Sequence, residues 1–302
     1  MKVLELTRKD IDYTKYIKRS AEESDYSELI TESCIGVENG VVRFVYQELD
    51  WDTTEIVNAL KRIKYATNER SAGLVTTSRI FGFRPRVTMR ADFCNVASLA
   101  KDFPREHSLV CGLAKKIEDL YHVTAPKQHQ YHKEIVDTKI KDSFRVNGSV
   151  FTSGIINKNN KLNYHFDSGN FTEVFSCMPV FKSGIKGGHL ALPEFDLGIE
   201  LKNNSILMFD GQAIMHGVTP IKYESEASYR YSVVFYSLKQ IWNCLEIDDE
   251  LARVRQRKME RERNRSKMTP EYRAELQKAL KQQIGRKEKY EGTPFNPKQG
   301  EK

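Results

Sequence analysis

The chain has 302 residues, a net charge of +7 and 39% hydrophobic residues. This length and composition suit one large globular domain, or a catalytic domain with appendages, and exclude a disordered chain. No apolar run reaches the roughly 18 residues that a membrane span needs. Acidic residues also follow the N-terminus too closely for a signal peptide. The sequence therefore predicts a protein that is neither inserted in a membrane nor secreted.

The five cysteines, at positions 34, 94, 111, 177 and 244, are scattered along the chain and form no C-x-x-C pair. An odd number without such pairs argues against both a disulfide framework and a zinc module. We therefore expect reduced cysteines in a reducing compartment, cytoplasmic or nuclear.

Residues 1–70 read as mostly helical. Thr53 or Thr54 can cap a helix whose apolar residues recur at helical spacing. Those residues are Ile56, Val57, Leu60 and Ile63. A second helix, from about Arg105 to His122, has a similar stripe, which is predicted to be buried. Its members are Leu109, Leu113, Ile117 and Leu120.

Between these two predicted helices, residues 78–86 contain arginine and phenylalanine residues interleaved around Gly82 and Pro85. The arginines are Arg79, Arg84 and Arg86, and the aromatic residues are Phe81 and Phe83. Such a segment can grip phosphates and insert an aromatic wedge into nucleic acid. Equally, the phenylalanines can be core residues and the arginines solvated. We expect residues 1–142 as a whole to be a helical buttress that includes this candidate nucleic-acid contact.

Residues 163–170 contain an H-x-D pair, His165 and Asp167. On a strand, side chains two residues apart project to the same face, so both would point together while Phe166 points away. A lone H-x-D pair is a weak signal, because short motifs often match by chance. A distal histidine strengthens it, since His216 lies 49 residues beyond Asp167.

Two histidines and one carboxylate form the facial triad of non-haem Fe(II) oxygenases, which leaves three coordination positions open. Arg230 follows His216 by 14 residues and opens a strand-like run. Its guanidinium would bind the distal carboxylate of 2-oxoglutarate through two parallel hydrogen bonds. The keto-acid end would take two of the open positions and O2 the third. These residues predict a dioxygenase that uses Fe(II), 2-oxoglutarate and O2.

The H-x-D pair, His216 and Arg230 each lie in or next to a β-like segment, at 149–156, 205–209 and 230–238. Residues 187–195 add a glycine-marked strand that is followed by a proline turn. A jelly-roll barrel presents ligands from adjacent strands to one mouth. We therefore predict an α+β fold with a double-stranded β-helix core over residues 143–247.

Residues 248–302 hold 16 Lys/Arg and 10 Asp/Glu, so +6 of the +7 net charge lies in this tail. A basic run can bind a polyanion, although such runs are more often a solvated helix face. Thr269, Pro270 and Glu271 together mark a helix start, and that helix would extend to Gly285, followed by a frayed end. The tail is thus predicted to be basic and helical.

Residues 151–236 resemble the TET/JBP branch of the 2-oxoglutarate dioxygenases, which contains the ten-eleven-translocation methylcytosine dioxygenases and the base-J thymine hydroxylases. The resemblance rests on residues 151–159, 165–170, 187–193, 216–217 and 230–236. Upstream, residues 78–86 and 92–94 are similar to the segment that precedes the thymine hydroxylase core.

The resemblance implies oxidation of the C5-methyl group of a pyrimidine in DNA, on a base that is flipped out or single-stranded. It implies that His165, Asp167 and His216 bind Fe(II), and that Arg230 and Ser232 bind 2-oxoglutarate. Asn170 stands where the methylcytosine enzymes place a base-reading asparagine, but its amide can pair with either cytosine or thymine. Arg79, Arg84 and Arg86 become candidate DNA contacts.

The chain departs from the family in two respects. It has no cysteine-rich zinc region, and His189 is an extra histidine, which we expect to be structural rather than a ligand. Three other functions stay open. An alkylation-repair dioxygenase usually has a second arginine six residues after the first, where this chain has Tyr236. A protein hydroxylase is compatible with the same fold, and a DNA-binding module would need the barrel to be catalytically degenerate. No obligate protein partner is predicted.

Overall fold

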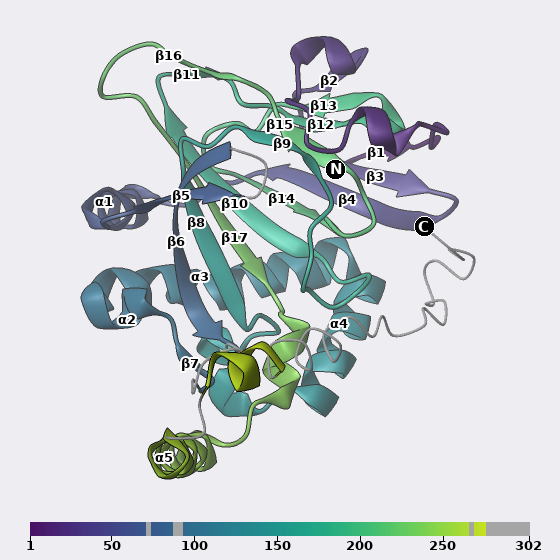
Figure 1. The fold of residues 1–302 in the computed structure, drawn as a ribbon. Helices are drawn as coiled ribbons and strands as arrows, with labels where there is room; N and C mark the ends of the chain where they lie inside the picture. Colours follow the sequence, from purple (N-terminus) through teal and green to yellow (C-terminus); the bar gives the residue numbers. More distant parts are fainter. Residues whose placement is uncertain (71–73, 87–92, 266–268, 276–302) are drawn as a thin grey trace.

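Two β-sheets face each other at the centre of the protein, seen in a computed structural model that describes residues 1–70, 74–86, 93–265 and 269–275 (Figure 1). The larger sheet has the strand order β1-β3-β4-β14-β10-β17-β8-β6-β5, with β7 paired to β6. Its strands are β1 (Lys2–Glu5), β3 (Cys34–Glu38), β4 (Val41–Glu48), β5 (Ala66–Arg70), β6 (Leu74–Arg84), β7 (Asn95–Val96), β8 (Ser153–Lys158), β10 (Ser176–Ser183), β14 (Ser205–Phe209) and β17 (Tyr229–Tyr236).

The smaller sheet has the order β2-β13-β12-β15-β9. Its strands are β2 (Glu28–Ile30), β9 (Leu162–His165), β12 (Leu190–Leu192), β13 (Leu197–Ile199) and β15 (His216–Val218). A separate antiparallel ribbon joins β11 (Ile185–Gly187) to β16 (Ile221–Tyr223). The predicted jelly-roll core agrees with these two facing sheets.

Helices cover the outer face of the larger sheet: α1 (Thr54–Arg62), α2 (Ser98–Asp102), α3 (Pro104–Thr124) and α4 (Pro126–Lys139) (Figure 1). Successive side chains of β17 point to opposite faces of the larger sheet, so this strand contributes both to the core and to a cavity. Tyr231, Val233 and Phe235 enter the hydrophobic core beneath the helices, whereas Arg230 and Ser232 line a cavity between the sheets. The functional side chains therefore stand on the face that the helices do not cover.

The prediction that residues 1–70 are mostly helical is wrong, because the described chain forms β1 to β5 there in addition to α1. The sequence does contain one signal for a β-hairpin here, the pair Asn39–Gly40 between two apolar runs. Both residues have positive φ, 52° and 76°, as the tight turn between β3 and β4 requires. The larger sheet therefore extends well beyond the core predicted for residues 143–247.

The helix predictions were more successful. Helix α1 is confirmed and buries Ile56, Val57 and Leu60. Helix α3 is also confirmed, but its buried face is rotated from the predicted one. Its fully buried apolar residues are Val110, Ala114, Ile117 and Tyr121, whereas Leu109, Leu113 and Leu120 are only partly buried.

Cys94 and Cys244 form a disulfide across 150 residues, which corrects the expectation of reduced cysteines throughout the chain. No sequence spacing indicates this pair, because the tertiary fold alone brings the β7 edge and the end of η6 (Lys239–Asn243) together. Cys34, Cys111 and Cys177 are free. Within the described part of the chain, no helix has the length and apolar character to cross a bilayer.

The C-terminal region begins with α5 (Ile247–Arg263). The Thr269 helix start is confirmed, since the Thr269 hydroxyl accepts a hydrogen bond from the Tyr272 backbone N–H at 3.3 Å and residues 270–275 are helical. The predicted continuation to Gly285 and the frayed end lie outside the described residues. The remaining short elements are 3-10 helices: η1 (Tyr13–Lys15), η2 (Glu23–Asp25), η3 (Asp142–Phe144), η4 (Val146–Gly148) and η5 (Pro193–Phe195).

Candidate metal centre and cosubstrate cavity

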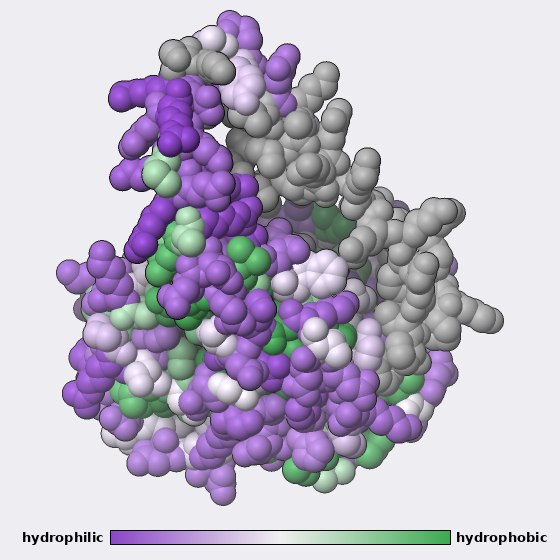
Figure 2. All heavy atoms as spheres, turned by 90° about the horizontal axis from the view of Figure 1, so that it is seen from below, coloured by the Kyte–Doolittle hydropathy of each residue, from purple (hydrophilic) through white to green (hydrophobic). Residues whose placement is uncertain are grey.

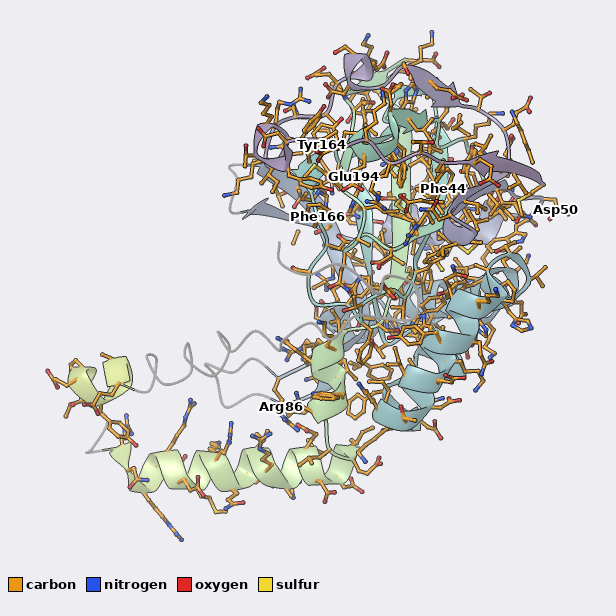
Figure 3. The ribbon with its side chains drawn as sticks, turned by 90° about the vertical axis from the view of Figure 1, so that its right-hand side faces the viewer. Phe44, Asp50, Arg86, Tyr164, Phe166 and Glu194 are labelled. Carbon is orange, nitrogen blue, oxygen red and sulfur yellow. A yellow bond between two sulfur atoms is a disulfide. The ribbon has the colours of Figure 1, made fainter. Side chains whose placement is uncertain are left out.

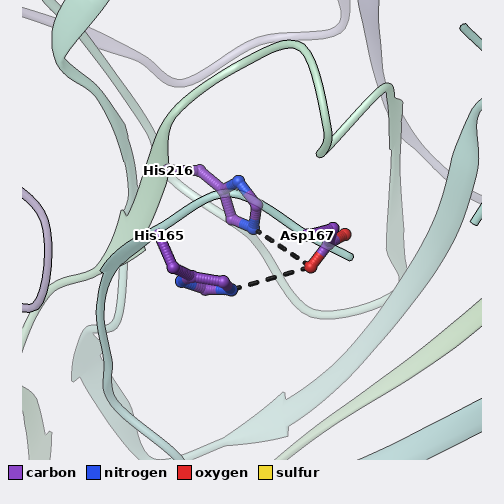
Figure 4. Close-up of side chains that lie close together, drawn as sticks. All are labelled: His165, Asp167 and His216. Carbon is purple, nitrogen blue, oxygen red and sulfur yellow. Dashed lines mark ion pairs between the residues drawn. The ribbon is translucent and has the colours of Figure 1, made fainter. Parts of the chain in front are cut away.

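Antiparallel pairing of β9 with β15 places His165 directly opposite His216. Asp167 faces both histidines, and its Oδ1 lies 3.7 Å from His165 Nε2 and 3.9 Å from His216 Nε2 (Figure 4). One ligand atom from each residue lies within 4.8 Å of the other two. Among the described residues, no other group of three or more His, Cys, Asp or Glu side chains lies close enough together to hold a metal ion.

The sequence predicted that His165 and Asp167 point together because both lie on one strand, and the structure shows this only for His165. Strand β9 ends at His165, so Asp167 stands in the following loop and not on the strand. The Asp167 backbone N–H donates to the Gly211 carbonyl at 2.8 Å, which joins the loop to the turn before β15. A Cβ on Gly211 would collide with the Asp167 carboxylate, so this close approach requires glycine.

The second nitrogen of each imidazole is also fixed. His165 Nδ1 donates to the Asn163 carbonyl at 2.7 Å, and His216 Nδ1 donates to the Ile214 carbonyl at 3.0 Å. The Nε2 atom of each ring therefore carries the imidazole lone pair and points it toward Asp167, as metal-binding histidines require. Burial, reinforced by His165, lowers the pKa of His216 to about 4, so His216 is neutral and able to bind a metal at neutral pH.

The triad opens into a cavity of about 280 Å³ that Arg230 and Ser232 also line. Arg230 is only 2% exposed, and burial lowers its pKa to about 10. Its Nε and Nη2 atoms are buried without a hydrogen-bond partner among the described residues. An unpaired buried guanidinium is costly, so this site is prepared for an anion such as a carboxylate. The residues present thus fit both Fe(II) and 2-oxoglutarate.

Asn170 lines the same cavity and is held from both sides. Its Nδ2 donates to the Ser176 hydroxyl at 3.1 Å, and its backbone carbonyl accepts from Gln212 Nε2 at 2.9 Å. An isolated β-bridge to Leu238 fixes the backbone further. The side chain is therefore preorganised beside the metal centre.

The sequence reasoning missed Asn157, which lies opposite Ser232 in the β8–β17 register and lines the cavity. Asn160 supports it, with Nδ2 donating to Asn157 Oδ1 at 3.1 Å. The signal for Asn157 was a polar residue directly after the apolar pair Ile155 and Ile156 of strand β8. Its meaning depends on strand register, which the sequence alone does not reveal.

The arginines of residues 78–86 do not stand at this cavity. Arg79 forms an ion pair with Asp102, and Arg86 forms one with Glu250. Arg84 lies at the end of β6 and is half-buried. The phenylalanines of this segment are packing residues: Phe81 is fully buried against Phe235, and Phe83 packs edge-on against Phe144.

His189 has the structural role expected of it. Its Nδ1 is 2.7 Å from the Tyr26 hydroxyl, and it does not belong to the metal-binding group. Lys182 is the cross-strand neighbour of Arg230, and burial lowers its pKa, but it does not line the cavity.

Facing sheets, a His–Asp–His centre and a buried unpaired arginine define the class of Fe(II)- and 2-oxoglutarate-dependent oxygenases. Comparison with known proteins narrows this class. Residues 94–239 match the Tet_JBP family, described as the oxygenase domain of the 2OGFeDO superfamily. This part of the chain is therefore similar to the Tet_JBP oxygenase domains.

Two curated relatives illustrate the match. The bifunctional helicase and thymine dioxygenase JBP2 of Leishmania braziliensis is 25% identical over 183 residues, which cover 60% of this chain and 16% of that protein. The thymine dioxygenase JBP1 of Trypanosoma brucei brucei is 25% identical over 145 residues, 47% of this chain and 17% of that protein. The chain therefore spans about a sixth of the length of these relatives.

The solved structure of NgTET1 in complex with 5mC DNA has the same fold. It superimposes with a TM-score of 0.55 at 14% identity, covering 72% of this chain and 81% of that chain.

Proposed function

We propose that this protein is an Fe(II)- and 2-oxoglutarate-dependent dioxygenase that hydroxylates the C5-methyl group of a pyrimidine in DNA. One observation carries the proposal: a His–Asp–His centre and the unpaired Arg230 guanidinium share a single cavity. The JBP relatives, which are thymine dioxygenases by name, support a DNA base as substrate. They also favour thymine over 5-methylcytosine as the first base to test.

His165, Asp167 and His216 would hold the iron, and Arg230 with Ser232 would hold the distal carboxylate of 2-oxoglutarate. Bound together, iron and 2-oxoglutarate activate O2 for oxidation of an unreactive methyl group. The contribution of the chain is to bind, orient and exclude water. Apolar residues such as Met178 and Val234 complete the cavity wall and keep water from the reacting methyl group.

Asn170 and Asn157 are the side-chain amides that can orient the base. Asn170 donates one N–H to Ser176, which leaves its amide oxygen as an acceptor for a base N–H. Asn157 accepts from Asn160 through its oxygen, so its own N–H groups can donate to a base carbonyl or to the cosubstrate. The cavity lies inside the fold, so the target base must leave the duplex stack to reach it.

The test is incubation with Fe(II), 2-oxoglutarate and duplexes containing thymine or 5-methylcytosine, followed by mass spectrometry of the nucleosides. We expect 5-hydroxymethyluracil from thymine, with succinate formed in equal amount. The control is Asp167→Asn, which keeps the shape of the side chain and removes its charge. Succinate without an oxidised base in any DNA would exclude the proposed substrate and favour a protein hydroxylase. Release of formaldehyde from N-methylated bases would instead indicate a repair enzyme.

A further inference from the structure

We propose that helix α5 binds the phosphates of duplex DNA through one face, formed by Arg253, Arg257, Lys258 and Arg261, and that the oxygenase domain holds this helix in a fixed position. The inference rests on the proposed function only in taking DNA as the substrate class. It names a second surface, outside the cavity, that would position the duplex.

Helix α5 projects from the body of the protein with its side chains in solvent (Figure 3). Every residue from Arg255 to the end of the helix is exposed. Figure 2 shows a predominantly hydrophilic surface along this projection. Its 17 residues correspond to a length of about 26 Å at 1.5 Å per residue. A helix this exposed is available to a partner along most of its length.

The charges on α5 are not evenly distributed around its axis. At about 100° per residue, the four residues of the basic face fall within an arc of roughly 140°. The two acidic residues of the exposed part, Glu260 and Glu262, fall outside that arc, as do Arg255 and Arg263. The helix therefore has one face on which four cationic residues gather without an exposed acidic residue among them.

The spacing of this face suits a nucleic-acid backbone. Arg257 and Arg261 are four residues apart, about 6 Å along the axis. Every second phosphate of a DNA strand is separated by about 6.8 Å along the duplex. Arginine can also bind phosphate oxygens through two parallel hydrogen bonds.

The N-terminal end of α5 is held against the oxygenase domain by hydrogen bonds to a buried carboxylate. Glu250, in the first turn, is 1% exposed and accepts hydrogen bonds from Arg86 Nε at 2.8 Å, the Cys94 backbone N–H at 3.0 Å and the Leu245 backbone N–H at 2.8 Å. The Cys94–Cys244 disulfide lies beside these contacts. A helix that served only as a solvated tail would not need a buried carboxylate with these donors at its base.

The direction of the helix is also consistent with a role near the cavity. Phe166 lines the cavity, and α5 extends toward the side of the protein on which Phe166 lies (Figure 3). The helix and this cavity residue therefore lie toward the same side of the protein in this view. Arg86, first considered as a DNA contact, anchors this helix through Glu250.

The experiment compares two double variants of the full chain that remove the same charge from the same helix. Arg257→Gln with Arg261→Gln alters the basic face, and Arg255→Gln with Arg263→Gln is the matched control. Binding to a duplex of A, U, G and C, which contains no C5-methyl group, is measured by fluorescence anisotropy from 50 to 200 mM salt. Without a substrate base, this measurement does not depend on catalysis.

We expect the basic-face variant to bind more weakly and to lower the slope of log affinity against log salt by about 1.8, or 0.9 for each of two phosphates. The control should lower the slope by less than half of that. Equal slopes for both variants, or two variants that bind like the wild type, would overturn the proposal. Asp167→Asn, which tests the proposed reaction, should keep wild-type binding to this duplex, so failure of one hypothesis is distinguishable from failure of the other.

Discussion

Replacing Arg230 with methionine tests how the cosubstrate is held. Arg230 is buried, lines the cavity and has two nitrogen atoms without partners among the described residues. Loss of a charge-assisted, bidentate contact to a carboxylate reduces the binding free energy by about 1.5–3 kcal/mol. That range corresponds to a 10- to 150-fold weaker affinity for 2-oxoglutarate, at roughly 1.4 kcal/mol for each factor of ten.

The measurement is anaerobic calorimetry of 2-oxoglutarate binding to the Fe(II)-loaded protein, because no turnover occurs without O2. Arg230→Lys keeps the charge but not the planar fork, so its affinity should lie between those of the wild type and Arg230→Met. The melting temperature of the cosubstrate-free protein should not fall in Arg230→Met, since an unpaired buried charge is replaced by an apolar side chain of similar length.

Lys182→Met is the matched control, because Lys182 is the neighbouring half-buried cation but does not line the cavity. Its affinity for 2-oxoglutarate should stay within about twofold of the wild-type value, as expected for a side chain without a contact to the ligand. Wild-type affinity in Arg230→Met would refute the assignment of Arg230. Weaker binding in Lys182→Met alone would transfer that role to Lys182.

Three further predictions concern the metal centre, the base and acid stability. Single alanine substitutions of His165, Asp167 and His216 should each abolish turnover and iron binding while far-ultraviolet circular dichroism stays unchanged; activity near the wild-type level in any of them would remove the iron assignment. Asn170→Ala should reduce DNA oxidation more than the uncoupled decarboxylation of 2-oxoglutarate, and an equal loss of both would make Asn170 a structural residue of the loop. Burial lowers the pKa of His216 to about 4 and that of His132 to about 3, whereas the unfolded chain takes up these protons near pH 6.5. Burial raises the pKa of Asp210 to about 7, so proton uptake there offsets part of this effect. The two histidines together outweigh the one carboxyl, so the metal-free protein should lose stability as the pH falls from 6.5 to about 4, and denaturant midpoints that are constant between pH 7 and pH 4 would contradict this.

Some of the site could be read directly from the sequence. His165, Asp167 and His216 were identified because metal ligation restricts the residue types so strongly that their order and spacing carry information. Arg230 was identified for a similar reason, since it follows His216 by 14 residues, opens a strand-like run and has a guanidinium that can bind a carboxylate. In each case the residue types, their order and their spacing along the chain sufficed, without knowledge of the contacts made in the folded protein.

The predictions for the first 142 residues were weaker because β-structure depends on partners. Strand β1 pairs in parallel with β3, and β2 pairs with β13 almost 170 residues away. Short strands with such remote partners have little periodicity of their own. Only the turn at Asn39–Gly40 was a local signal for this part of the sheet.

The sequence alone indicated the chemistry of the candidate site, because the residue types of the ligands and of Arg230, with their order and spacing, can be read from the chain itself. The tertiary structure decided everything that depends on register and remote approach. It placed Asn157 opposite Ser232, closed the Cys94–Cys244 bond and turned Arg86 from a candidate DNA contact into the anchor of α5. These outcomes arise when segments up to about 160 residues apart are brought together, and no local pattern encodes such an approach.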